Sequence, residues 1–491
     1  MSLKRSLALA VCVCLLPLYA LALDGPVYEV FVASFADGDG DRRGDLRGLR
    51  DKLPYIDSLH VDGLWLMPIS PSPSYHKYDV TDYQAIDPAY GTMDDFRVLA
   101  QSCAALDISL ILDLVVNHTS NQHPWFLSAC QSLQDGLDSP YRDYYRFSRD
   151  TGHPVPDLPG WYYHGSFGPH MPDLNLDSPL LRGEIKAIMA FWLQAGADGF
   201  RLDGTTHYYE DNLAQNAAFL SWLNLEAKAL KPEAYIVAEA WKPEGVILGM
   251  YQSGVDSFFN FSFSGSTGII VEALRGQKGQ NLAVKIADWQ AKVRQANPLA
   301  LDAPFLSNHD MGRSAGYLMY NQQKMKLAAA LLLTMPGIPF IYYGEELGMS
   351  GSGLDENKRL PMLWQGDALL NCLPPPGADQ KQRLKAGADE QEPDPASLLN
   401  FYRDVLSIRA AHPLLKDGLT EAVGLGSPAL AAWRCADGEE SLLVIHNLSD
   451  LQVEITLPQG VISAAWSTGS GAPAMTGESL ILPPLSGCII R

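Results

Sequence analysis

The sequence is poor in basic residues. Its 491 residues include 36 Lys and Arg against 56 Asp and Glu, a formal net charge of −20. A surface with that excess of negative charge repels phosphate backbones and anionic lipid headgroups, which argues against nucleic acids and membrane surfaces as partners. After residue 22 the chain also lacks a run of the roughly 20 apolar residues that a membrane-spanning helix needs, so we expect no membrane association of the mature protein.

Cysteine is scarce and follows no metal-binding pattern. Cys12 and Cys14 fall in the first 22 residues, and five others follow: Cys103, Cys130, Cys372, Cys435 and Cys488. An odd number allows at most two disulfides and leaves at least one thiol free. Because no C-x-x-C pair occurs, a zinc knuckle or a thioredoxin-like site is unsupported.

The first 22 residues have the three parts of a secretory signal. Lys4 and Arg5 precede an apolar run from Leu7 to Leu21, and small residues flank the predicted cleavage point after Ala22. We therefore expect a secreted or periplasmic protein.

Eight short apolar or β-branched runs recur along the chain, most of them separated by helix-length segments. They are Val27–Ala36, Val61–Ile69, Ile108–Val116, Ala197–Gly204, Ala234–Trp241, Val255–Phe261, Ala303–Asp310 and Gly337–Glu346. Apolar strands that alternate with helices indicate a parallel sheet covered by helices. Eight such units predict an α/β fold of the (β/α)8 TIM-barrel type.

Two irregularities predict further domains. About sixty residues rich in Pro, Gly and aromatics separate the third and fourth runs, so residues 118–172 are expected to form an inserted lobe. Short alternating segments fill residues 413–491 and predict a C-terminal antiparallel β-sandwich. The catalytic barrel then comprises residues 23–117 and 173–412.

Acidic residues gather at the carboxyl ends of the predicted strands, where barrel enzymes keep their chemistry. Asp203 ends the fourth run, Glu239 lies near the end of the fifth, and Asp310 ends the seventh. Cleavage of a glycosidic bond needs a carboxylate nucleophile and a protonated acid that face one bond. Arg201, two residues before Asp203, shares its strand face and is expected to keep it ionised, whereas burial between two alanines is expected to raise the pKa of Glu239.

Four motifs resemble the signature regions of the α-amylase family, glycoside hydrolase family thirteen. They are Asp113–His118, Gly199–Asp203, Glu239–Trp241 and Ser307–Asp310, in the family's order. The resemblance extends from about Val27 to the C-terminus. It implies a retaining glycosidase of α-linked glucans in which Asp203 is the nucleophile, Glu239 the acid/base, and Asp310 the residue that stabilises the distorted sugar.

The same resemblance assigns residues to substrate binding. Arg201 would support the nucleophile, and His118 and His309 would hydrogen-bond the hydroxyls of the sugar being cleaved. In Tyr75–Val80, similar to a segment after the family's second strand, His76 would bind that sugar and Tyr78 would stack on it, with Lys77 in place of the usual Gly.

Two further segments resemble those of an intermediate subgroup that contains secreted bacterial α-amylases. Met171–Asn175 is similar to its fifth signature, and Arg359–Trp364 to its motif after the barrel. The second likeness implies that Arg359 pairs with Asp79 near the cleaved sugar.

Substrate preference is indicated by residues after the nucleophile. Gly204 stands where oligo-1,6-glucosidases tend to carry Val, which favours α-1,4 cleavage. Thr206 replaces a Lys that many α-amylases place before His207. We expect a monomeric enzyme that cuts internal bonds of starch and maltooligosaccharides. The alternatives are an exo-acting α-glucosidase or oligo-1,6-glucosidase, a transglycosylase, and a catalytically silent barrel used for binding.

An acidic loop after the first run predicts a metal site. Carboxylates occupy alternate positions at Asp37, Asp39 and Asp41, with the Arg43 carbonyl and Asp45 following, as in the first half of a calcium loop. Arg42 replaces the turn Gly and position 12 lacks Glu, so it is not an EF-hand. Because four acids within nine residues repel one another without a cation, we expect structural Ca²⁺ there.

Overall fold

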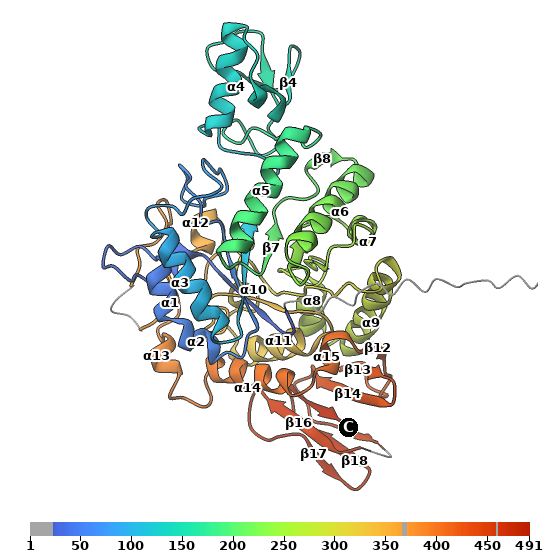
Figure 1. Cartoon of the computed structure of the whole chain (residues 1–491). Helices are drawn as coiled ribbons and strands as arrows, with labels where there is room; N and C mark the ends of the chain where they lie inside the picture. Colours follow the sequence, from blue (N-terminus) through green and yellow to red (C-terminus); the bar gives the residue numbers. More distant parts are fainter. Residues whose placement is uncertain (1–22, 366–370, 458–459) are drawn as a thin grey trace, which may run out of the picture.

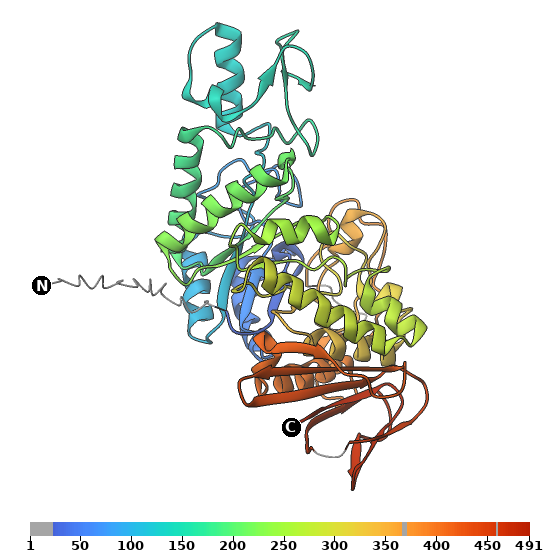
Figure 2. The same cartoon turned by 90° about the vertical axis from the view of Figure 1, so that its right-hand side faces the viewer.

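The computed structural model describes residues 23–365, 371–457 and 460–491. The secretory signal predicted for residues 1–22 therefore lies outside the described residues. A central barrel lies between a projecting lobe at one end and the C-terminal sheets at the other, in both views (Figures 1 and 2).

The barrel is a parallel sheet with strand order β10-β9-β7-β3-β2-β1-β11. The strands are β1 (Val27–Val30), β2 (Gly63–Leu66), β3 (Ser109–Leu114), β7 (Gly199–Leu202), β9 (Tyr235–Ala238), β10 (Ser257–Phe258) and β11 (Phe340–Tyr342). Each lies within one of the predicted runs. The register places the ends of neighbouring strands at one rim, for example Leu202 opposite Ala238.

The seventh predicted run closes the barrel without forming a full strand. Ala303 bridges Phe259 beyond β10, and Phe305 bridges Phe340 of β11, both in parallel. Pro304 stands between them and has no amide hydrogen, so the ladder is reduced to these two bridges. The predicted eight-membered TIM barrel is confirmed, with its seventh member the least regular.

Side chains from several strands fill the barrel interior. Buried residues of this inner cluster include Trp65, Ile111, Val237, Phe259 and Phe340. Helices cover the outside, and the longer ones bury apolar faces against the sheet. The helices outside the lobe, including short ones at the active site and beside the C-terminal sheets, follow in chain order. They are α1 (Leu46–Asp51), α2 (Leu53–Asp57), α3 (Met93–Ala104), α5 (Pro179–Ala195), α6 (Leu213–Leu230), α7 (Glu244–Tyr251), α8 (Ile269–Gly276), α9 (Gly279–Ala296), α10 (Ser314–Tyr317), α11 (Gln322–Thr334), α12 (Asp355–Lys358), α13 (Ala388–Gln391), α14 (Leu398–Ala410) and α15 (Leu414–Asp417).

The segment between β3 and α5 forms the projecting lobe (Figure 1). It contains α4 (Pro124–Asp135), a 3-10 helix (Pro140–Tyr144) and a small sheet of β4 (Phe147–Ser148), β5 (His153–Pro154) and β6 (Tyr162–Tyr163). Aromatic rings form its core, with Phe126 against Tyr145 and Tyr163 at centroid distances of 5.0 and 4.9 Å. A short strand, β8 (Tyr208–Asp211), follows β7 at the barrel rim.

The C-terminal region forms two antiparallel sheets, as predicted. One has the order β12-β13-β14-β19-β16 and the other β15-β18-β17. The strands are β12 (Leu419–Ala422), β13 (Leu430–Asp437), β14 (Glu440–Asn447), β15 (Val453–Thr456), β16 (Ile462–Ser467), β17 (Ala474–Thr476), β18 (Ser479–Leu482) and β19 (Ser486–Ile490). β12 and β13 contact α9 of the barrel. No alternation marks β19, because all five of its residues are buried.

The five cysteines between residues 103 and 488 are all free and buried. Burial raises the pKa of each thiol to about 11 or 12. Among the helices described, none combines the length and apolar character needed to cross a bilayer.

Candidate active site

Arg201 joins the acidic residues at the ends of three strands. Its side chain, 1% exposed, extends from β7, and Nη1 donates to Asp203 at 2.7 Å and to Asp113 on β3 at 3.0 Å. Nη2 contacts the carboxylate of Glu239, which follows β9. Asp203 and Glu239 were predicted to converge from neighbouring strands, and a shared guanidinium now places them at one point of the rim.

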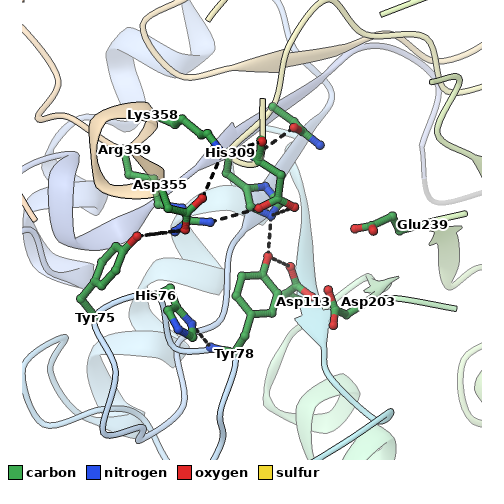
Figure 3. Close-up of polar contacts among 12 residues, drawn as sticks. Tyr75, His76, Tyr78, Asp113, Asp203, Glu239, His309, Asp355, Lys358 and Arg359 are labelled. Carbon is green, nitrogen blue, oxygen red and sulfur yellow. Dashed lines mark hydrogen bonds and ion pairs between the residues drawn. The ribbon is translucent and has the colours of Figure 1, made fainter. Parts of the chain in front are cut away.

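Both carboxylates remain accessible to a ligand. The side chain of Asp203 is 12% exposed and that of Glu239 13%, whereas Asp113 is fully covered. Burial raises the pKa of Asp113 to about 7, although Arg201 opposes that shift. Asp113 lies beside Asp203 and Tyr78 (Figure 3) and is a covered support of the acid cluster.

His309 lies at the centre of a second cluster of charged side chains. Its Nδ1 lies 2.5 Å from Glu29 on β1, and its Nε2 lies 2.8 Å from the Tyr78 hydroxyl and 3.1 Å from Asp310. Burial alone would lower the pKa of His309, but the carboxylates of Asp310 and Glu29 raise it to about 9. The imidazole is therefore a cation at neutral pH, and both of its nitrogens donate.

Asp310 is kept ionised by its neighbours. Partial burial favours the neutral form, but His309 and Arg359 together hold the pKa of Asp310 well below its usual range. Its side chain is 34% exposed, so a carboxylate oxygen remains available.

Arg359 binds partners other than the one predicted. It contacts Asp310 at 3.2 Å, the Tyr75 hydroxyl at 2.8 Å and the carboxylate of Asp355 (Figure 3). The predicted pair with Asp79 is wrong. Asp79 is buried, and its carboxylate accepts hydrogen bonds from two serine hydroxyls, with Ser72 at 2.6 Å. Those local donors already satisfy the carboxylate inside its own loop.

The loop after β2 carries His76 and Tyr78 into the site, as predicted. The ring of Tyr78 stacks on His309 with centroids 5.7 Å apart, and its amide donates to His76 Nδ1 at 3.1 Å. Lys77 has φ +70°, a left-handed conformation that explains why glycine is usual at this position. Its ammonium lies 2.5 Å from Asp87, which anchors the loop in that conformation.

The lobe contributes two rings to the rim. His118 lies within hydrogen-bonding distance of the Tyr78 carbonyl at 3.2 Å. Phe167, one of the aromatic residues of the lobe, is 40% exposed, and its ring lies between those of His118 and His207, with centroid distances of 5.0 and 4.8 Å. The Phe167 ring is therefore accessible to a ligand at the barrel rim.

Sequence reasoning did not assign a role to four further residues of the site: Glu29, Tyr75, Asp355 and Lys358. Asp355 precedes Arg359 by four residues, a spacing that brings side chains together on one helical face and could have revealed it. Lys358 donates to the Asp310 carbonyl at 2.8 Å. Nothing in the local sequence distinguishes Glu29, since its partner His309 lies 280 residues away.

Three of the loop acids after β1 converge. Carboxylate oxygens of Asp37, Asp39 and Asp45 lie within 4.8 Å of one another, whereas Asp41 is not in this group. Asp45 also caps α1, accepting the amides of Arg47 and Gly48 at 2.8 Å each. The convergence gives a set of hard oxygen donors.

Comparison with known proteins identifies the family. The profile of the α-amylase catalytic domain matches residues 29–418, and that of the α-amylase SusG C-terminal domain matches residues 430–489. The chain belongs to the α-amylase family. Alpha-amylase 3 of Dictyoglomus thermophilum is 41% identical over 435 residues, which cover 87% of this chain and 85% of that protein.

Other members of the α-amylase family are also similar. A 4-alpha-glucanotransferase of Thermotoga neapolitana is 31% identical over 443 residues, with 86% of this chain and 95% of that protein covered. The structure titled Eubacterium rectale Amy13B superimposes with a TM-score of 0.92, at 40% identity and 96% coverage of both chains. This α-amylase family chain is a glycoside hydrolase whose substrates are α-glucans.

Proposed function

We propose that the chain is a secreted α-amylase that hydrolyses internal α-1,4-glucosidic bonds with retention of configuration. The observation that carries the proposal is the Arg201 guanidinium shared by Asp203 and Glu239. This shared contact supports the placement of both carboxylates at one glycosidic bond, which is the arrangement that double displacement requires.

In the proposed reaction, Glu239 donates its proton to the glycosidic oxygen while an oxygen of Asp203 attacks the anomeric carbon. The bond to the leaving sugar breaks and a glycosyl ester on Asp203 forms. Glu239, now a base, removes a proton from water, which displaces Asp203 and restores the original configuration.

The remaining polar groups position the sugar. Asp310, ionised and one-third exposed, accepts hydrogen bonds from hydroxyls of the distorted ring, and Nε2 of His309, which lies 3.1 Å from Asp310, would be shared with a ring hydroxyl. Tyr78 stacks on the ring, while His76 and His118 bind from the loop and the lobe. Arg359 holds Asp310 in place and would act on the same sugar through that carboxylate.

Product analysis tests the mode of attack. With maltoheptaose blocked at its non-reducing end, internal cleavage releases short products, whereas an exo-acting α-glucosidase releases none. Starch, maltotriose, isomaltose and pullulan in parallel report the linkage, and we expect the α-1,4 substrates to be cleaved. Glucose from isomaltose but not from starch would contradict the proposal. Longer products from maltotriose would favour a transferase, as one relative's name suggests.

We further propose that the loop of Asp37, Asp39 and Asp45 binds a structural Ca²⁺. Each carboxylate accepts backbone amides and keeps lone pairs for a cation, as calcium loops do. The Asp41 side chain and the Arg43 carbonyl complete the proposed set. The loop follows β1 and holds no group of the reaction, so the ion would supply stability alone.

Removal of calcium is expected to lower the melting temperature. An ion at one hundred times its dissociation constant stabilises the fold by about 2.7 kcal/mol, and chelation by EDTA removes that contribution. Asp39→Asn should abolish the effect of calcium in calorimetry. The control is Asp82→Asn, because Asp82 is also exposed and accepts the amide two residues ahead, at 3.0 Å. An unchanged melting curve of the wild type with EDTA would contradict the site.

We also propose that the mature enzyme is secreted or periplasmic, begins at Leu23 and is a monomer. The charged, apolar and small-residue segments of residues 1–22 support the first two statements. Mass spectrometry of the exported protein and light scattering would test all three.

A further inference from the structure

Thr205 holds the backbone of Glu239. It follows β7 by three residues and is 0% exposed. Its amide donates to the Glu239 carbonyl at 3.1 Å and its hydroxyl donates to the same oxygen at 2.5 Å. The amide of Glu239 in turn donates to Leu202 at 3.0 Å. Leu202 and Thr205, which lie before and after Asp203, therefore bind the main-chain amide and carbonyl of Glu239.

A turn at Gly204 makes this contact possible. Gly204 has φ +52°, so the chain reverses directly after Asp203 and brings Thr205 back toward Glu239. A Cβ at this position would also lie 3.1 Å from the Phe167 ring. Both the left-handed conformation and the close approach to Phe167 favour glycine at position 204. The next residue, Thr205, supplies the hydroxyl that binds Glu239.

We propose that Thr205 is a positioning residue that sets the place of Glu239 relative to Asp203. The inference rests on the proposed roles of the two acids. Proton transfer requires the Glu239 carboxyl at the glycosidic oxygen while Asp203 reaches the anomeric carbon, two atoms that are bonded to each other. Displacements of about 1 Å at such a site cost up to about 10²-fold in rate. The Thr205 hydroxyl connects the segments that follow β7 and β9, where such a displacement between the two acids would arise.

Thr205→Val removes the hydroxyl and leaves the amide bond and the side-chain volume. The change should act on proton donation more than on nucleophilic attack, because the lost hydroxyl binds the main chain of Glu239 and makes no contact with the Asp203 carboxylate. Two substrates separate the steps. Maltoheptaose needs a proton on its leaving oxygen, whereas α-maltosyl fluoride releases fluoride with little acid assistance. For both, kcat/KM reports the formation of the glycosyl-enzyme.

We expect Thr205→Val to lower kcat/KM for maltoheptaose by about 10-fold and for α-maltosyl fluoride by about twofold or less. Thr205→Ser, which keeps the hydroxyl, should restore the ratio of the two constants toward the wild-type value. The matched control is Thr334→Val in α11, where a fully buried hydroxyl donates to the Ala330 carbonyl at 2.7 Å away from the rim. It should lower the melting temperature and leave the ratio unchanged.

Two results would overturn the inference: equal fold losses of kcat/KM on both substrates in Thr205→Val, or no loss on either substrate. Failure of the proposed roles of the two acids is recognised separately, because Asp203→Ala would then keep the wild-type turnover of maltoheptaose.

Discussion

Asp203→Ala is expected to lower kcat on maltooligosaccharides by ~10⁴-fold or more, because the variant lacks the carboxylate that forms the glycosyl ester. Glu239→Ala should be similarly slow on the same substrates. The two variants differ in rescue by azide with α-maltosyl fluoride as donor. Azide in Asp203→Ala attacks the sugar directly and gives the β-azide. In Glu239→Ala it displaces Asp203 from the intermediate and gives the α-azide.

The control for both variants is Asp177→Asn, since that carboxylate is 61% exposed and bonds Tyr209 outside the acid cluster. It should keep wild-type activity. NMR of the azide products decides the assignment. If the two anomers were exchanged between the variants, the roles of Asp203 and Glu239 would have to be exchanged as well.

Arg201→Met is expected to lower the free energy of unfolding by about 3–5 kcal/mol, because it leaves buried carboxylates without their shared cation. The guanidinium is 1% exposed and contacts Asp113, Asp203 and Glu239, so solvent cannot replace it. Activity should be lost as well, since both exposed acids lose their common anchor. Urea unfolding, followed by intrinsic fluorescence, measures the change.

Adding Asp113→Asn to Arg201→Met should restore part of the lost stability. Burial already raises the pKa of Asp113 to about 7, so a neutral side chain suits that position once the cation is gone. Arg47→Met is the surface control, because the Arg47 side chain is 49% exposed in its pair with Asp95 and such pairs contribute about 0–1 kcal/mol. A loss no larger for Arg201 than for Arg47 would refute the account of the cluster.

Sequence reasoning predicted the barrel and the residues at its rim because both depend on local order along the chain. Apolar runs mark strands, and the residue that follows a parallel strand must lie at the rim, which placed Asp203 and Glu239. The partners of those residues depend on distant segments. Glu29 meets His309 only after the barrel closes, and Arg359 prefers Asp355 on its own helical turn to the distant Asp79.

Backbone geometry was equally hard to foresee. Lys77 occupies a left-handed position where the family's motif has glycine, and only the folded structure shows the Asp87 carboxylate that anchors it. Phe167 could not be separated from the rings of the lobe core, because exposure is a property of the assembled lobe. The role of Thr205 could not be predicted from the sequence either, because its partner is the main-chain oxygen of Glu239.

The burial of the five cysteine thiols determines the redox conditions under which this enzyme can be produced. Each of the five thiols stays protonated at neutral pH and is shielded from reagents in bulk water. Folding of the described chain therefore needs no thiol oxidase or disulfide isomerase. A cytoplasm rich in glutathione and an oxidising medium should yield the same native protein, with equal tolerance of dithiothreitol.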